Sequence, residues 1–147
     1  MREFWVESDG VRLFVKEAGS GPVVLMLHGG MANHQAALPL IAPLADRYRI
    51  IAPDLRGSGS SWCASPLTFN QLGDDVERLL DLIGVDRAVV GGISSGTGVA
   101  LHFALRRPDR LIGLVVVKLV YAGEQRRYTE GQKAVFAMMD SGKPSTR

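Results

Sequence analysis

Residues 89–98 read VVGGISSGTG, and this stretch decides the fold. An apolar run ends at two glycines, a serine follows in the spacing Gly92-x-Ser94-x-Gly96, and a helical pattern of small residues begins at once. This order predicts a nucleophile elbow, a sharp strand-to-helix turn with the serine hydroxyl at its tip. Side chains at positions 92 and 96 are expected to clash with neighbouring chain. Ser94 is therefore the candidate nucleophile, and the N–H of Ser95 is placed at a helix start, where it can bind an oxyanion.

The chain around this stretch alternates apolar strands with helical segments. Asp9-Gly10 separates two alternating segments and predicts an antiparallel hairpin. The segments expected to form strands are 3–8, 11–18, 23–27, 48–52, 88–91 and 111–117, of which 23–27, 48–52 and 111–117 have the continuous apolar pattern of strands buried on both faces. Helical spacing is present at 35–46, 69–83 and 95–107, with Pro39 and Pro43 indicating that the first helix is short or broken. The pattern predicts an α/β fold with a mostly parallel, doubly wound sheet and an N-terminal antiparallel hairpin.

Composition excludes several classes of protein. The 147 residues carry 17 Lys and Arg against 15 Asp and Glu, a net charge of +2 that is too small and too evenly spread to indicate a nucleic-acid or membrane partner. Cys63 is the single cysteine, so no internal disulfide forms and a reducing compartment is favoured. No signal peptide and no apolar run of about 20 residues is present. The sequence predicts a cytoplasmic protein without a metal site or cofactor.

Three motifs, in the right order, resemble the α/β-hydrolase family. His28-Gly29-Gly30 is similar to that family's oxyanion-loop motif, and residues 54–61 (DLRGSGSS) are similar to its D-x-x-G-x-G-x-S loop. Gly92-Ile93-Ser94-Ser95-Gly96 matches its nucleophile elbow. The resemblance extends over about residues 3 to 118 and implies a partial α/β-hydrolase fold, with residues 1–118 as the N-terminal part of the core. It implies that 119–147 is the truncated start of a cap region.

The catalytic acid and base of such an enzyme are not found in this chain. The family places them after the nucleophile, in the order Ser, Asp or Glu, His. The only histidine after Ser94 is His102, eight positions along a predicted helix and so about 12 Å away. A general base must approach the hydroxyl to about 3 Å. Lys118 stands where some family members carry the acid. We therefore interpret the chain as truncated.

Further site residues follow from the resemblance. It implies an oxyanion hole formed by the N–H groups of Ser95 and Gly30, with Met31 as the alternative to Gly30. The candidates for the substrate pocket are His28, Met31 and Trp62, although a ring that braces its own loop fits His28 and ordinary packing fits the other two.

Two more residues near these motifs have structural interpretations. His34 is expected to be a solvated loop histidine, with a place at the entrance of the site as the alternative. Asp54 is expected to shape its loop through Asx-type hydrogen bonds.

The resulting prediction is a serine hydrolase that acts on an ester, lactone or amide of a small molecule by acyl transfer through Ser94. The alternative is a non-catalytic fragment, or a binding and interaction module, that keeps the elbow as architecture. The missing base favours this alternative, in which unpaired sheet edges would lead to self-association.

Overall fold

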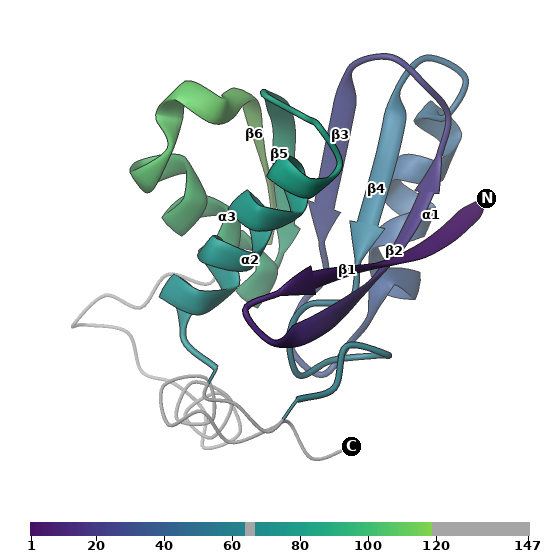
Figure 1. Ribbon diagram of the computed structural model, residues 1–147. Coiled ribbons are helices and arrows are strands. Elements are labelled where there is room, and N and C mark those ends of the chain that lie inside the picture. The colour runs from purple at the N-terminus through teal and green to yellow at the C-terminus, as the bar shows by residue number, and fades with distance from the viewer. Residues whose placement is uncertain (64–66, 119–147) are drawn as a thin grey trace.

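A six-stranded sheet with the strand order β1-β2-β4-β3-β5-β6 forms the centre of the molecule (Figure 1). The computed structural model describes residues 1–63 and 67–118. The strands are β1 (Arg2–Ser8), β2 (Val11–Ala18), β3 (Val23–Leu27), β4 (Arg49–Pro53), β5 (Ala88–Ile93) and β6 (Leu111–Val117). The predicted fold class is confirmed, while the predicted cap region at 119–147 lies outside the described residues.

The N-terminal hairpin forms where Asp9-Gly10 predicted it. Asp9 and Gly10 have φ values of 50° and 78°, the left-handed conformation that a two-residue hairpin turn requires. β2 then pairs antiparallel with β4, with Val15 opposite Pro53. Because Pro53 ends β4, the hairpin turn projects beyond that end of the sheet.

β4, β3, β5 and β6 lie side by side in that order and are parallel to one another. Their carboxyl ends therefore meet at one edge of the sheet, which is where open α/β sheets bind ligands. The loop after β3, the loop after β4 and Ser94 after β5 all begin at this edge.

Helices cover both faces of the sheet. α1 (His34–Ile41) lies on one face, and α2 (Phe69–Leu82) and α3 (Ser95–Arg106) lie on the other (Figure 1). α1 is shorter than the predicted 35–46, because the chain leaves the α-helix for a short 3₁₀ helix, η1 (Ala42–Leu44), that contains Pro43. A second 3₁₀ helix, η2 (Pro108–Arg110), follows α3 and leads directly into β6.

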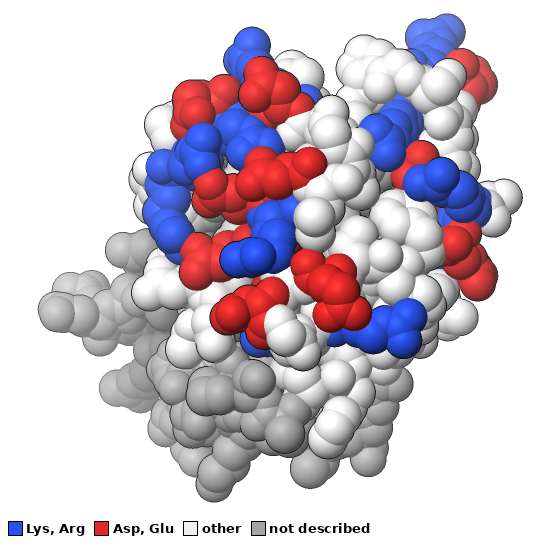
Figure 2. All heavy atoms as spheres, in the orientation of Figure 1, with Lys and Arg blue, Asp and Glu red and all other residues white. Residues whose placement is uncertain are grey.

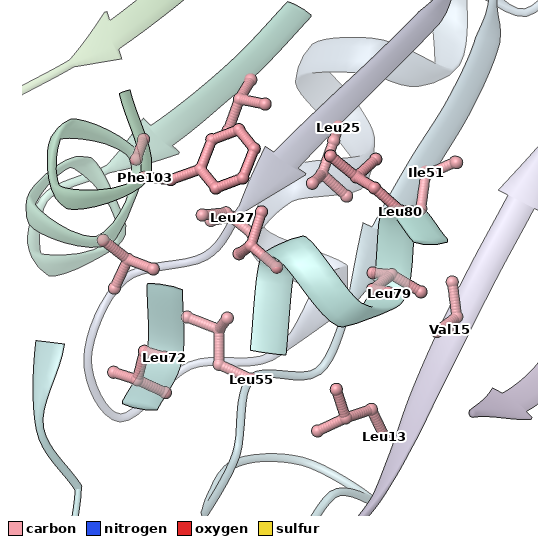
Figure 3. Close-up of a cluster of buried hydrophobic side chains, with 14 of the residues drawn as sticks. Leu13, Val15, Leu25, Leu27, Ile51, Leu55, Leu72, Leu79, Leu80 and Phe103 are labelled. Carbon is pink, nitrogen blue, oxygen red and sulfur yellow. The ribbon is translucent and has the colours of Figure 1, made fainter. Parts of the chain in front are cut away.

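Alternate residues of β3 enter two separate cores. Leu25 and Leu27 pack with α2 and α3, whereas Val24 and Met26 pack with α1. Figure 3 shows the larger core, in which residues from the sheet and from the loop after β4 face residues from α2 and α3: Leu13, Val15, Leu25, Leu27, Ile51, Leu55, Leu72, Leu79, Leu80 and Phe103. The central strands are thus fixed from both sides.

β6 is the strand for which the burial prediction is wrong. Its sequence is continuously apolar, yet Ile112 is 54% exposed and Val116 is 44% exposed. Within residues 1–63 and 67–118, β6 pairs only with β5, so its outer edge is not covered by another strand. A continuous apolar run predicts burial only where neighbours cover both faces of the strand.

Acidic and basic side chains are interspersed over the face formed by α2 and α3 (Figure 2). Several of them form ion pairs, namely Arg106 with Asp74, Arg107 with Glu77 and Arg110 with Asp81. The mixture of signs accords with the small net charge.

Candidate active site

The turn between β5 and α3 has the strained geometry of a nucleophile elbow. Ser94 has φ 53° and ψ −117°, a conformation that side-chain-bearing residues rarely adopt and that costs about 1–3 kcal/mol. Ser94 stands at the N-cap position of α3, yet its side chain makes no capping hydrogen bond. The turn therefore places Ser94 at the carboxyl edge of the sheet, directly after β5.

The expectation that glycine is required on both sides of Ser94 is confirmed. A Cβ at Gly92 would lie 2.2 Å from the carbonyl carbon of Gly96. A Cβ at Gly96 would lie 2.4 Å from the carbonyl oxygen of His28 and 2.6 Å from that of Leu27. The start of α3 is thus in backbone contact with both β5 and the end of β3, and no side chain fits between them.

Two hydrogen bonds brace the elbow from within the sheet. The Ser94 N–H donates to the carbonyl oxygen of Val117 in β6, at 2.9 Å. The buried Thr97 hydroxyl donates to the carbonyl oxygen of Gly92, at 2.7 Å. Sequence reasoning missed Thr97, although a hydroxyl residue three positions after the candidate nucleophile could have drawn attention to it.

The loop after β3 reaches the elbow through Gly29. A Cβ at Gly29 would lie 3.4 Å from the Cβ of Ser94 and 3.2 Å from the carbonyl oxygen of Ile93. Gly30 and Met31 follow directly, and Met31 has φ 58° with 67% of its surface exposed. Ser95 begins α3, so its N–H has no acceptor within the helix. The structure brings the candidate donors' loops together at Ser94.

His28 is almost fully buried and braces this loop. Its Nδ1 lies 2.7 Å from the carbonyl oxygen of Gly29, and its Nε2 lies 2.9 Å from the backbone nitrogen of Leu55. These partners require Nδ1 to donate and Nε2 to accept, which is the pattern of a neutral imidazole. The ring thus ties the end of β3 to the residues after β4.

Trp62, the third candidate for the substrate pocket, lies beside the N-terminal hairpin. It is 68% exposed and lines a hollow of about 500 Å³ together with Trp5, Val11 and Arg12 of the hairpin. Ser94 is not among the residues that line this hollow.

Asp54 and His34 form a buried pair that sequence reasoning missed. His34 is mostly buried, and its Nδ1 lies 2.7 Å from Oδ1 of Asp54, so the prediction of a solvated loop histidine is wrong. The Asp54 carboxylate does accept a hydrogen bond from its own loop, and the donor is the Ser60 N–H. In an Asx turn the donor would instead be the N–H two residues after Asp54. Twenty residues separate His34 from Asp54, and no local pattern pairs them.

The loop after β4 is also anchored by a buried ion pair. Arg56 donates from Nε to one carboxylate oxygen of Asp75 in α2, at 2.8 Å, and from its terminal nitrogen to the other, also at 2.8 Å. The same guanidinium donates to the Ser8 carbonyl oxygen. The hydrogen bonds with Asp75 raise the pKa of Arg56. This pair connects the loop to the hairpin and to α2.

The remaining histidine lies far along α3 from the elbow's tip. His102 lies about two turns along α3 from Ser94 and stacks on Phe69, with ring centroids 5.5 Å apart.

Among the described residues, no group of three or more His, Cys, Asp or Glu side chains is arranged to hold a metal ion. Within the same part of the chain, none of the helices has the length and apolar character needed to cross a membrane.

Comparison with known proteins gives a family match. A family model described as alpha/beta hydrolase fold matches residues 22–126. The chain is 34% identical, over 86% of its length, to the dihydrolipoyllysine-residue acetyltransferase component of the acetoin cleaving system of Cupriavidus necator. It is 36% identical, over 75% of its length, to epoxide hydrolase 3 of Siraitia grosvenorii.

Solved structures show the same fold. The structure of a thermophilic esterase from Thermogutta terrifontis superimposes with a TM-score of 0.75 at 28% identity, covering 85% of this chain and 49% of that one. The matches to the two curated relatives cover 35% and 36% of their lengths. This chain thus spans about a third of those relatives and about half of the esterase.

Proposed function

Since this chain belongs to the α/β-hydrolase family, we propose that it supplies the nucleophile and the oxyanion hole of a serine hydrolase that acts on an ester, lactone or amide. The observation that carries the proposal is the strained backbone of Ser94, held between two glycines that accept no side chain. Backbone strain of this size persists where the surrounding structure enforces it, and it is concentrated at functional sites.

The first chemical step would form a bond between the Ser94 Oγ and the substrate's carbonyl carbon. The carbonyl π electrons move to its oxygen, and the backbone N–H groups of Ser95 and Gly30 are the donors assigned to that oxyanion. Each such donor contributes a few kcal/mol of transition-state stabilisation. Met31 remains the alternative to Gly30, and its exposed side chain fits a residue that meets the substrate.

The proton of Ser94 must pass to a general base. His28 uses both ring nitrogens for the backbone of Gly29 and Leu55, and His102 stacks on Phe69. The His34 ring packs against Phe14 of β2, a strand that β4 and β3 separate from β5. These three are all the histidines of the chain, so we assign the base to a histidine outside residues 1–147. In the whole enzyme this base would pass the proton to the departing alcohol or amine as the substrate's C–O or C–N bond breaks and the acyl ester of Ser94 forms. It would later activate the water that releases the acyl group.

Carbonyl chemistry fits a serine better than epoxide opening, although some relatives are named epoxide hydrolases. Attack of a hydroxyl on an epoxide carbon would leave an alkyl ether on Ser94, and water does not cleave such an ether under mild conditions. Attack on an ester, lactone or amide leaves an acyl ester, which water hydrolyses. The nucleophile of a covalent catalyst must be released again, and only the second route provides that release.

Labelling with a fluorophosphonate tests the proposal. We expect the probe to modify Ser94, located by mass spectrometry, and added imidazole to accelerate the modification by replacing the base. Ser94→Ala should abolish the labelling, and Ser95→Ala should retain it because only the backbone N–H of residue 95 is used. Labelling that survives Ser94→Ala, or none with imidazole present, would leave the elbow as architecture only.

A further inference from the structure

Residues 28–34 form the loop in which Gly30 or Met31 supplies a proposed oxyanion donor. Both ends of this loop are hydrogen-bonded to the loop after β4, at its consecutive residues Asp54 and Leu55. At its first residue, the His28 ring accepts the Leu55 N–H. At its far end, His34 bonds to Asp54 through both its backbone N–H (2.8 Å) and its ring Nδ1 (2.7 Å). The donors at Gly30 and Met31 lie between these two anchors.

Asp54 is built to hold three hydrogen bonds at once. Its side chain is fully buried, one oxygen accepts both bonds from His34, and the other accepts the Ser60 N–H at 2.7 Å. Gly59 leaves the space for this arrangement, because a Cβ there would lie 2.0 Å from the second carboxylate oxygen. A buried carboxylate that kept fewer partners would carry a large desolvation cost.

The His34 ring is also fixed by packing. Its centroid lies 5.2 Å from that of Phe14 in β2, and the Phe14 carbonyl oxygen accepts the Asp54 N–H at 2.8 Å. The ring orientation that serves Asp54 is thus set by the sheet. Met31, in the strained left-handed region, lies three residues before His34.

We propose that the buried His34–Asp54 pair positions the oxyanion loop of Ser94, so that the pair acts on catalysis through the geometry of residues 29–31 and touches no substrate itself. This inference rests on the function proposed above. A donor N–H must lie within a few tenths of an ångström of its place to stabilise an oxyanion. His28 fixes only one end of the loop, and the pair fixes the other.

Three substitutions at His34 separate positioning from general stability. Asparagine carries its amide nitrogen where histidine carries Nδ1, so His34→Asn retains the donor to Asp54. His34→Leu removes it, and His34→Gln, whose amide lies one atom further out, is the second variant in case the leucine protein fails to fold. Two quantities are measured in each variant: the ¹⁵N order parameters of the Gly30 and Met31 N–H groups, and the imidazole-assisted rate of fluorophosphonate labelling at Ser94.

We expect the order parameters to fall from about 0.85 to below about 0.6 in His34→Leu and His34→Gln and to keep the wild-type value in His34→Asn. The rate of labelling at Ser94 should fall by about tenfold in His34→Leu and His34→Gln. This is the factor that loss of one hydrogen bond to a charged group produces. Unchanged order parameters in a folded His34→Leu or His34→Gln protein would overturn the proposal, and so would failure of His34→Asn to restore them. Wild-type protein that is not labelled at Ser94 would overturn the proposed function, while the order parameters would still decide whether the pair holds the loop.

Discussion

The two sides of the candidate site are held in place by different means. On one side, the elbow at Ser94 is fixed by backbone packed against backbone, with Gly92 and Gly96 leaving no room for a side chain. On the other, the loop 28–34 is fixed by side-chain hydrogen bonds to Asp54 and Leu55. The elbow should therefore be intolerant of any added atom, whereas the loop should depend on particular donors and acceptors.

The largest effect is expected for Gly92→Ala, which places a methyl group 2.2 Å from the Gly96 backbone. Backbone atoms cannot move aside as a flexible side chain can, so the free energy of unfolding should fall by at least about 3 kcal/mol. Urea unfolding measures this. Gly113→Ala in β6 is the matched control, because its Cβ would meet only a Val89 methyl group at 3.8 Å. A similar loss of unfolding free energy in the two variants would contradict the claim that the elbow tolerates no added atom.

On the loop side, His28→Leu should lower the free energy of unfolding by about 2 kcal/mol. The substitution keeps an apolar side chain in the space but leaves the Leu55 N–H without the acceptor it has in the wild-type protein, and a buried unpaired N–H costs about 1–3 kcal/mol. His102→Leu serves as the comparison, because that partly exposed ring is stacked on Phe69 and has no hydrogen bond to another of the described residues. Equal costs at positions 28 and 102 would contradict the bracing role of His28.

The Thr97 side chain also supports the elbow by hydrogen bonding, and removal of its hydroxyl sharpens the comparison. Thr97→Val keeps the shape of the side chain and removes the 2.7 Å bond to the Gly92 carbonyl oxygen. A loss of about 1 kcal/mol in unfolding free energy is expected, with Thr97→Ser close to wild type. A Thr97→Ser variant as unstable as Thr97→Val would mean that the methyl group, not the hydroxyl, supports the elbow.

The smallest effect is expected at Ser94. Glycine adopts positive φ without strain, so Ser94→Gly should be more stable than Ser94→Ala by about 0.5–1 kcal/mol despite the greater entropy of its unfolded chain. Thermal unfolding of the two variants in parallel gives the difference. If the alanine variant is the more stable one, the elbow is not strained at Ser94.

The parts of this molecule that local chemistry determines were predictable from the sequence. Asp9-Gly10 fixed the hairpin turn, and the apolar run at 111–117 coincides with β6. The glycines on either side of Ser94 predicted a close approach of backbone atoms, and the structure confirms this approach. The hairpin turn, the strand and the contact between Gly92 and Gly96 each depend on neighbours within a few residues, which a sequence displays directly.

The parts that depend on distant residues were not predictable in the same way. His34 meets Asp54 only because β3 and β4 are adjacent in the sheet, and Arg56 meets Asp75 only because α2 packs over the loop. The exposure of β6 has the same origin, since burial depends on what covers a strand and not on its composition. For the same reason, sequence reasoning assigned a role to Gly30 but none to Gly29, which is the glycine that lies against Ser94.

The central claim is that Ser94, Ser95 and the loop after β3 form one oxyanion-binding site. The most direct measurement is a crystal structure of the protein after fluorophosphonate treatment. The account predicts phosphorus bonded to the Ser94 Oγ, with the phosphonyl oxygen about 2.7–3.1 Å from the Ser95 nitrogen and from that of Gly30 or Met31. A phosphonyl oxygen directed away from both nitrogens, or an adduct on a different residue, would contradict it.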